Sequence, residues 1–291
     1  MRGAPGWRLR EEESMIVNNL NAITRVVCNL TWRCSLPPCI YCWIYGKDGV
    51  GSGFVDQTQH RELSAKQWIT ALARLPGRGI VDFCGGEPTL HEGFVEIVNN
   101  LNPNYGWAVT TNLAQDRNAE VLSLVENRRG VAVTASYHYH TPFDDWLVRL
   151  RWLGNLDRFP VSVTFVQSPY MDYRQEIERL KHLRNLPKIV ANITLQRYQN
   201  PQDSNLPISQ ELWGGRPSPF CTAGKVHIGL APSGDIYRCT TAFQSNRRNE
   251  FTLGNLLTTD PLVFRGGPCD LNCDPVCSSG CWGIKRERGV A

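Results

Sequence analysis

The sequence predicts an α/β protein: a partial (β/α)6 barrel of the TIM type, followed by a small C-terminal cysteine-rich domain of hairpin and loops. Between residues 24 and 196, short β-branched runs alternate with amphipathic helical stretches. Few polar residues interrupt these runs, which is typical of a parallel sheet with right-handed crossovers. The expected strands are Thr24–Leu30, Gly79–Cys84, Trp107–Thr111, Val131–Ser136, Val161–Val166 and Ile189–Leu195.

Helical periodicity fills the intervals between the strands. Ser64 and Gln67 have the spacing of a capping box at the start of the first helix. Ligands of such sheets bind beyond the carboxyl ends of the strands, so we expect functional residues there. The expected helices are Ala65–Leu75, Gly93–Leu101, Asn118–Glu126, Asp144–Leu153 and Tyr173–Leu183.

The composition changes after residue 196, which predicts a boundary between two domains. Residues 198–219 are rich in Gln, Asn, Pro, Ser and Gly and are typical of a linker. The segment KVHIGLAPSGDIYRC then predicts a β-hairpin that turns at Pro-Ser-Gly-Asp, and the chain from Thr252 onward is expected to be loop. We therefore expect a lead-in over 1–20, the barrel over 21–200, and linker plus cysteine-rich domain over 201–291.

Composition and charge exclude several classes of protein. No apolar run approaches the roughly 20 residues that a membrane helix needs, and MRGAPGWRLREEES lacks the apolar stretch of a secretory signal. The net charge of +4 comes without a dense Lys/Arg run, which argues against a dedicated nucleic-acid binder. Eleven cysteines without an export signal favour metal binding over disulfides. These features predict a reducing cytoplasm.

Three cysteines directly follow the first expected strand. Cys34, Cys39 and Cys42 lie in RCSLPPCIYCW, where three thiolates can hold three corners of a [4Fe-4S] cubane. One iron would then keep an open position that can take hold of a substrate. The alternative is a structural zinc loop with Cys28 as its fourth ligand. Cys28, however, lies within an apparent strand, where a buried cysteine usually packs as a small apolar residue.

The segment NLTWRCSLPPCIYC resembles the cluster loop of radical S-adenosylmethionine (SAM) enzymes. The resemblance implies that the open iron binds the amino and carboxylate groups of SAM, and that the reduced cluster cleaves SAM into methionine and a 5′-deoxyadenosyl radical. Tyr41 falls at the family's aromatic position, which implies packing near the adenine. The family usually spaces its cysteines by three and then two residues. This chain has four and then two, with Pro37 and Pro38 in the longer gap.

A second motif follows the second expected strand, in VDFCGGEPTL. Gly85, Gly86, Glu87 and Pro88 match the GGEP segment of the same family. The resemblance implies that the glycines let the backbone approach the methionine part of SAM, and that Glu87 adds negative charge near its ammonium group. Taken alone, the segment is also compatible with a Gly-Gly turn and an N-capping acid. Cys84 is expected to be packed, and would be a candidate hydrogen-atom donor if it faced the cavity.

Polar residues end the next two expected strands. Thr111 and Asn112 stand where the family often has a Thr-Asn pair lining the site, and Ser136 stands where a polar residue often contacts the ribose. His138 and His140 follow near the same rim. Either histidine is a candidate to touch substrate or to act as an acid or base.

The remaining cysteines lie in the C-terminal part of the chain. FCTAGKVHIGLAPSGDIYRC and the following FTLGN resemble the SPASM and shorter twitch extensions of radical SAM enzymes, which implies one or two auxiliary [4Fe-4S] clusters. The spacing of the later cysteines departs from the family's two, five and three. The candidate ligands are Cys221, Cys239, Cys269, Cys273, Cys277 and Cys281.

Six cysteines fill one four-thiolate cluster with two left over, or two clusters that each lack one ligand. The reading we favour is one cluster held by Cys221, Cys239 and Cys281 with a further thiolate. Asp270 or Asp274 can fill a vacant position. A zinc knuckle built from the same residues is the alternative.

The predicted function is a radical SAM enzyme that abstracts hydrogen from a small-molecule or short-peptide substrate. An auxiliary cluster would accept an electron, which favours net oxidation by dehydrogenation or crosslinking. The electron for SAM cleavage would come from a flavodoxin- or ferredoxin-type donor. The alternatives are an epimerase, a glycyl-radical activase and a zinc-binding adaptor. Activases usually carry extra cysteines soon after the cluster loop, and residues 43–83 contain none.

Overall fold

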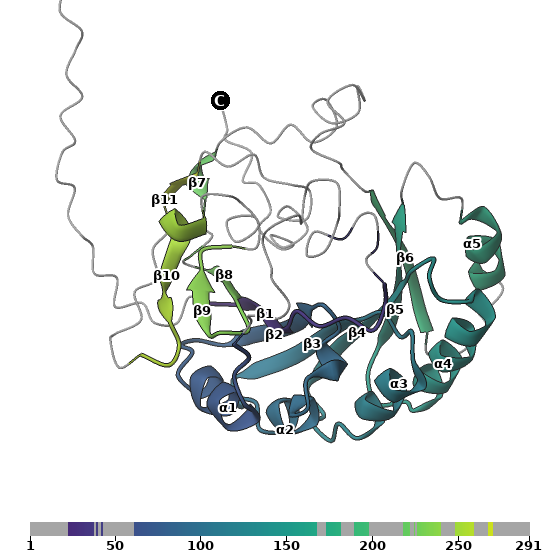
Figure 1. The fold of residues 1–291 in the computed structure, drawn as a ribbon, viewed down its shortest axis with the longest axis horizontal. Helices are drawn as coiled ribbons and strands as arrows, with labels where there is room; N and C mark the ends of the chain where they lie inside the picture. The colour runs from purple at the N-terminus through teal and green to yellow at the C-terminus, as the bar shows by residue number, and fades with distance from the viewer. Residues whose placement is uncertain are drawn as a thin grey trace, which may run out of the picture.

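The computed structural model describes residues 23–37, 39, 42, 61–167, 173–181, 189–197, 218–221, 224, 226–239, 248–258 and 267–269. Parallel strands form a curved sheet in which each strand lies beside the next one in the sequence (Figure 1). This order confirms the predicted partial barrel. The strands are β1 (Arg25–Thr31), β2 (Gly79–Gly85), β3 (Tyr105–Thr111), β4 (Gly130–Tyr137), β5 (Val161–Gln167) and β6 (Ile189–Arg197).

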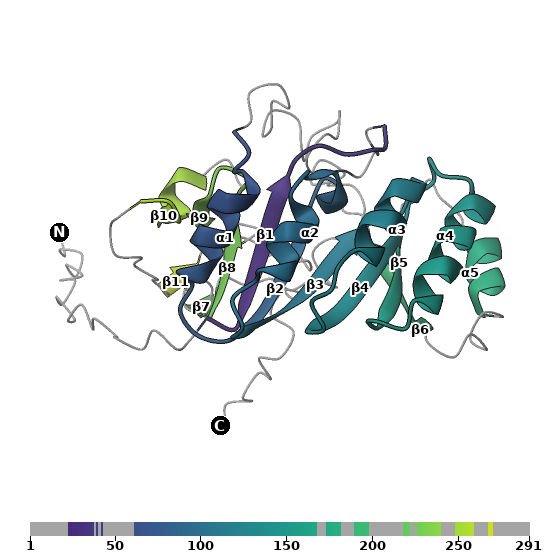
Figure 2. The ribbon, with the colours of Figure 1, turned by 90° about the horizontal axis from the view of Figure 1, so that it is seen from below.

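Helices cover the convex face of the sheet, as Figures 1 and 2 show. The predicted capping box is confirmed: Ser64 caps the first helix, and Gln67 closes the reciprocal contact. A short 3-10 helix, η1 (Pro88–Leu90), follows β2. The α-helices are α1 (Ala65–Ala73), α2 (Phe94–Asn99), α3 (Asp116–Ser123), α4 (Phe143–Asn155) and α5 (Arg174–Lys181).

The hydrophobic core lies between these helices and the convex face of the sheet. Phe83 and Trp107 from the strands, and Trp68 and Trp146 from the helices, are fully buried there. Each side chain of this size contributes about 1.5–3 kcal/mol through burial. Cys28 belongs to the same core cluster, which confirms that it is a packing residue.

The predicted C-terminal hairpin is present and joins the main sheet. It consists of β8 (His227–Leu230) and β9 (Asp235–Tyr237), and β8 pairs in parallel with β1. The Asn29 side chain strengthens this junction by donating to the Leu230 carbonyl at 2.8 Å. The hairpin therefore extends the edge of the barrel.

The prediction of loop from Thr252 onward is wrong for two segments. Thr252–Asn255 forms β10, which pairs antiparallel with β9 and follows the short helix η3 (Arg248–Phe251). Gly267–Cys269 forms β11, which pairs antiparallel with β7 (Ser218–Cys221) in a separate two-stranded sheet. Both segments are short, and distant pairing partners decide their conformation.

Among the helices that the structure describes, none is both long and apolar enough to cross a membrane.

Candidate functional site

The segments singled out in the sequence meet at the carboxyl edge of the sheet. The cysteine loop follows β1, GGEP spans the end of β2, Asn112 follows β3, and His138 follows β4. Parallel strands bring their carboxyl ends to one edge, so segments far apart in the chain become neighbours. The hydrogen bonds described below join them.

The backbone of the GGEP segment is bonded directly to the start of the cysteine loop. Gly86 N donates to the Thr31 carbonyl at 2.9 Å, and Glu87 N donates to the Arg33 carbonyl at 2.7 Å. A Cβ atom at Gly86 would lie 2.1 Å from the Arg33 oxygen, and Gly85 has a φ of 123°. Both positions therefore require glycine, because the chain's own backbone occupies the space of a side chain.

The three loop cysteines differ in exposure. Cys39 is buried, with 6% of its surface exposed, whereas Cys34 and Cys42 are half-buried. Cys42 N donates to the Cys39 carbonyl at 2.9 Å, which closes a turn between the two residues. Of the remaining loop positions, Tyr41 lies outside the described residues.

The pKa of the Cys34 thiol is raised, mainly because burial disfavours the thiolate. The negative charges of Glu87 and Cys42 raise this pKa further, so Cys42 lies close enough to Cys34 to affect it. Hydrogen bonds from the Leu36 backbone and from Asn112 act in the opposite direction. Binding of a cationic metal group would displace the thiol proton and favour the thiolate of Cys34 over the protonated thiol.

Asn112 joins the cysteine loop to the ends of two strands. Its Nδ2 lies 3.6 Å from the Cys34 sulfur and 3.2 Å from Ser35 Oγ, to both of which it donates. Its backbone N donates to Glu87 Oε2 at 2.7 Å, and its carbonyl accepts from the Trp146 indole at 3.1 Å. The contact with Cys34 was not predictable from the sequence, since the two residues are far apart in the chain.

Glu87 is fully buried, and both of its carboxylate oxygens accept hydrogen bonds within the protein. Oε1 accepts from the Thr89 hydroxyl at 2.7 Å and from Thr89 N at 3.2 Å, while Oε2 accepts from Asn112 N. Burial raises the pKa of this carboxyl, and these bonds together with one from the Thr111 hydroxyl lower it in part. The carboxylate thus ties the end of β2 to the end of β3.

Thr111 and Thr110 point to opposite faces of β3. Tyr105, Trp107, Val109 and Thr111 alternate with more exposed residues, so Thr111 lies on the helix-covered face. It is 1% exposed, and its hydroxyl accepts a hydrogen bond from Leu113 N at 3.1 Å. Thr110 lies on the concave face.

The two histidines after β4 have different surroundings. His138 Nδ1 lies 3.7 Å from the Cys39 sulfur. Burial, with a further effect from the nearby His140, lowers the pKa of His138 to about 4. Among the residues that the structure describes, neither the buried Nε2 of His140 nor the hydroxyl oxygen of the adjacent Thr141 has a hydrogen-bond partner.

The concave face of the sheet is polar and lined by small side chains. Thr134 on β4 and Ser162 on β5 share a hydrogen bond of 3.1 Å, and Ser136 follows on the same face of β4. Arg25 and Asp82 form an ion pair at 2.7 Å toward the amino ends of β1 and β2. Such a face differs sharply from the apolar convex face and suits a polar ligand.

Cys84 belongs to this concave face and is half-buried, and it is not part of the hydrophobic core beneath the helices. Its sulfur lies 3.3 Å from Asn29 Oδ1, to which it donates. Burial is the main cause that raises the pKa of the Cys84 thiol, and the charge of Asp82 adds to it. The alternation of Val81 and Phe83 with Asp82 and Cys84 was the sequence signal for this orientation.

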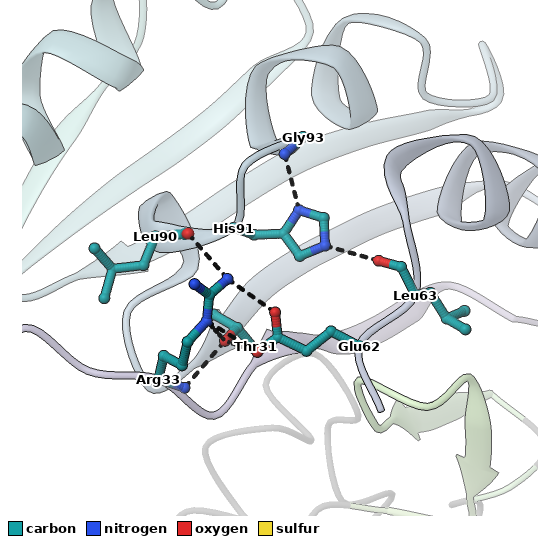
Figure 3. A network of polar contacts seen from close by, with 7 residues as sticks. All are labelled: Thr31, Arg33, Glu62, Leu63, Leu90, His91 and Gly93. Atoms are coloured by element: carbon teal, nitrogen blue, oxygen red, sulfur yellow. Dashed lines mark hydrogen bonds and ion pairs between the residues drawn. The ribbon is translucent and has the colours of Figure 1, made fainter. Parts of the chain in front are cut away.

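A polar network joins the end of β1 to η1 and to the residues just before α1 (Figure 3). The Arg33 guanidinium donates to Glu62 at 2.9 Å and to the Leu90 carbonyl at 3.2 Å. The Thr31 hydroxyl also bonds Glu62. One residue further on, the imidazole of His91 bonds the Leu63 carbonyl at 2.9 Å and accepts from Gly93 N at 3.1 Å. The network fixes β1, η1 and the start of α1 relative to one another.

Of the six C-terminal cysteines, Cys221, Cys239 and Cys269 lie within the described residues. Because β8 is parallel to β1 and β9 is antiparallel to β8, Cys239 emerges near the amino end of β1. Cys221 ends β7, before β8 begins, and Cys269 ends β11, which pairs with β7. Cys239 is buried. The predicted ligands Cys273, Cys277 and Cys281 lie outside the described residues.

The donor set of the loop fits an iron–sulfur cluster. Within the described part of the chain, no three His, Cys, Asp or Glu side chains converge as they would around a single metal ion. A mononuclear zinc site would need such convergence, with sulfurs about 2.3 Å from the metal. A cubane spreads its thiolates over separate iron atoms, and three thiols on one loop suit that wider group.

Two solved structures share this fold over most of the chain. Streptococcus suis SuiB bound to S-adenosylmethionine aligns with a TM-score of 0.53 at 14% identity, over 83% of this chain and 67% of SuiB. Histidine-tagged anSMEcpe with bound AdoMet aligns with a TM-score of 0.52 at 15% identity, over 80% of this chain and 75% of that protein. This likeness confirms the fold. No protein-family model and no curated protein matches the sequence.

Proposed function

We propose that the protein is a radical SAM enzyme. One observation carries the proposal: a loop with three cysteines leaves β1 at the carboxyl edge and is bonded there to GGEP and Asn112. The sequence resemblance of both motifs and the shared fold with two SAM-bound proteins point the same way. These three supports are of different kinds: the motif resemblance is local sequence, the contacts of the loop are hydrogen bonds, and the shared fold is topology.

Cys34, Cys39 and Cys42 would hold the [4Fe-4S] cluster, and the iron without a protein ligand would bind SAM. When reduced, this cluster supplies the electron that cleaves SAM into methionine and a 5′-deoxyadenosyl radical. We assign the lining of the SAM site to the following residues: Tyr41, Gly85, Gly86, Pro88, Asn112 and Ser136.

We assign Glu87 and Thr111 a positioning role in this site. The oxygens of Glu87 are bonded to Thr89 and Asn112, and the Thr111 hydroxyl is bonded inside the protein as well. Both groups can therefore support the SAM site without contacting SAM. Their bonds hold the ends of β2 and β3 in the arrangement that presents Asn112 to Cys34.

The substrate that we propose is a small polar molecule or a short peptide, held against the concave face of the sheet. The small hydroxyl side chains of that face leave room and offer hydrogen bonds. The unsatisfied Nε2 of His140 and hydroxyl of Thr141 support a polar substrate, because a buried polar atom is costly until a ligand bonds it. We therefore assign His140 to substrate contact.

The reaction that we propose is net oxidation, by dehydrogenation or crosslinking, in a biosynthetic pathway. An auxiliary cluster bound by cysteines from the set Cys221, Cys239, Cys269, Cys273, Cys277 and Cys281 would accept the substrate's electron. Cys239 lies toward the amino end of the barrel, so an electron accepted there would leave from that end. A flavodoxin- or ferredoxin-type donor in a reducing cytoplasm completes the proposal.

The test is anaerobic reconstitution with iron and sulfide, followed by incubation with dithionite and SAM. We expect 5′-deoxyadenosine, and we expect Cys34→Ala, Cys39→Ala and Cys42→Ala each to abolish it. Cys28→Ala is the matched control, because this cysteine packs in the core and should leave cleavage intact. A wild-type protein that binds zinc only and forms no 5′-deoxyadenosine would overturn the proposal in favour of a metal-binding adaptor.

Cys84 supports a second candidate function, epimerisation. Its thiol faces the concave side, and its raised pKa keeps it protonated. Hydrogen transfer from this thiol to a substrate radical would leave a thiyl radical, which one electron and one proton would restore. Turnover in D2O separates the two functions: epimerisation places one solvent deuterium in the product and is lost in Cys84→Ala, whereas dehydrogenation places none.

A further inference from the structure

His138 lies against one of the three proposed cluster ligands. Its Nδ1 is 3.7 Å from the Cys39 sulfur, and Cys39 is the most deeply buried cysteine of the loop. A nitrogen at this distance can donate a hydrogen bond to sulfur, from the Nδ1–H tautomer or from the imidazolium. Burial limits the competition of water for the same sulfur.

Contacts of the residues before and after His138 fix its position. The preceding residue, Tyr137, packs its ring against Phe143, Trp146, Phe165 and Tyr173, with ring centroids 5.3–5.7 Å apart. On the other side, Thr141 N donates to the His138 carbonyl at 3.0 Å, and the Tyr137 hydroxyl donates to the Thr141 carbonyl at 3.1 Å. An imidazole on such a support keeps its orientation toward the sulfur.

We infer that His138 tunes the cluster by donating a hydrogen bond from Nδ1 to the thiolate of Cys39. The inference rests on the proposed function, because it requires a cluster at Cys34, Cys39 and Cys42. It moves His138 from the substrate contacts, where the sequence suggested it, to the ligand sphere of the cluster.

The expected consequence is a higher reduction potential. Reduction adds negative charge to the cluster and its thiolates, so a donor aimed at a thiolate stabilises the reduced state more than the oxidised state. Hydrogen bonds to ligand sulfurs are among the established determinants of cluster potential. A cluster that must pass an electron to SAM would thus be easier to reduce by its donor, at some loss of driving force for cleavage.

The test is a redox titration of the cluster followed by EPR, without SAM, on protein carrying Cys221→Ala and Cys239→Ala to weaken the auxiliary signals. His138→Phe removes the donor. His138→Asn places an amide nitrogen as many bonds from the backbone as Nδ1, whereas His138→Gln places it further out. His140→Phe is the matched control from the same loop. Iron is counted in every sample.

We expect His138→Phe and His138→Gln to lower the equilibrium constant for one-electron reduction about tenfold, which is about 59 mV. His138→Asn and His140→Phe should stay near the wild-type potential. An unchanged potential in His138→Phe would overturn the inference, and so would an equal fall in His138→Asn or His140→Phe, which would indicate packing alone. If His138→Phe binds no iron, the Asn and Gln variants decide the same question. Absence of a cluster signal from the wild type would instead overturn the proposed function.

Discussion

The two edges of the barrel sheet carry their cysteines in different ways. At the carboxyl edge, Cys34 and its neighbours sit on one loop that GGEP, Asn112 and His138 hold from three further strands. Cys239 follows β9 toward the amino edge, whereas Cys221 and Cys269 end β7 and β11 of a separate two-stranded sheet. β1 has 7 residues, so at about 3.3 Å per residue the two edges of the sheet lie roughly 20 Å apart.

The difference indicates two kinds of task. A preorganised loop with three cysteines suits the proposed site, which must bind and orient a cofactor. Cysteines from several strand ends suit a group that closes a structure and passes electrons. The polar concave face lies between the two edges, where a substrate could reach both. Substitutions at both edges of the sheet test this division.

The largest effect is expected when two of the C-terminal cysteines, Cys221 and Cys239, are removed. We expect the double variant Cys221→Ala, Cys239→Ala to lose product formation and still form 5′-deoxyadenosine without substrate turnover. Any single alanine variant of the carboxyl-edge loop should lose both activities. Quantifying 5′-deoxyadenosine and product in the same reactions checks this. Equal loss of both in the double variant would contradict the division of tasks.

Two glycines give the next comparison. Gly86→Ala would force a Cβ atom against the Arg33 carbonyl, so we expect the free energy of unfolding to fall by roughly 3 kcal/mol. Gly254 in β10 has open space around it and a φ of 123°. Only backbone strain therefore opposes Gly254→Ala, at a cost of about 1 kcal/mol. Urea unfolding of the apoproteins measures both. Effects of similar size would show that the close approach at Gly86 relaxes easily.

Glu87→Gln tests the buried carboxylate. Asn112 N and the Thr89 groups donate to its two oxygens, and an amide would direct an NH2 group at one of these donors. We expect a loss of about 2 kcal/mol in the free energy of unfolding. Glu120→Gln, on the exposed face of α3, should change it by less than about 0.5 kcal/mol. A more stable Glu87→Gln variant would mean that removing the buried charge outweighs the lost bonds.

The smallest effect is expected from Tyr105 at the amino edge. Its hydroxyl donates to the Pro76 carbonyl at 2.5 Å, and burial raises its pKa from 10.0 to about 12. A raised pKa stabilises the folded state at full strength below pH 10, and this contribution is lost as the pH rises from 10 to about 12. Tyr105→Phe should lose about 1 kcal/mol at neutral pH and lack this alkaline decline. Identical alkaline unfolding of both proteins would exclude the assignment.

Local sequence was sufficient for most of the fold, because hydrophobic period and turn residues are local signals. The strands and helices of the barrel were predicted to within a few residues, and so was the capping box at Ser64. The pairing of β8 with β1 was not predicted, because it joins residues about 200 positions apart. The existence of β10 was not predicted either, because β10 depends on pairing with β9, about 15 positions earlier in the chain.

The sequence predicted which segments form the site, and it did not predict the hydrogen bonds between them. Strand alternation predicts the orientation of Thr111 and Cys84. Thr111 lies on the same face of β3 as Trp107, whereas Cys84 lies on the face of β2 opposite to Phe83. The bonds from Asn112 to Cys34 and from His138 to Cys39 join residues on different strands. Only the folded chain brings them together.

We propose that one iron of a cluster held by Cys34, Cys39 and Cys42 is open to SAM. Pulsed EPR of the reduced Cys221→Ala, Cys239→Ala protein tests it directly, using SAM labelled with 15N at its amino group. We predict that SAM shifts the g values of the cluster and adds a 15N hyperfine coupling. A cluster spectrum that SAM leaves unchanged, with no 15N coupling, would contradict the claim.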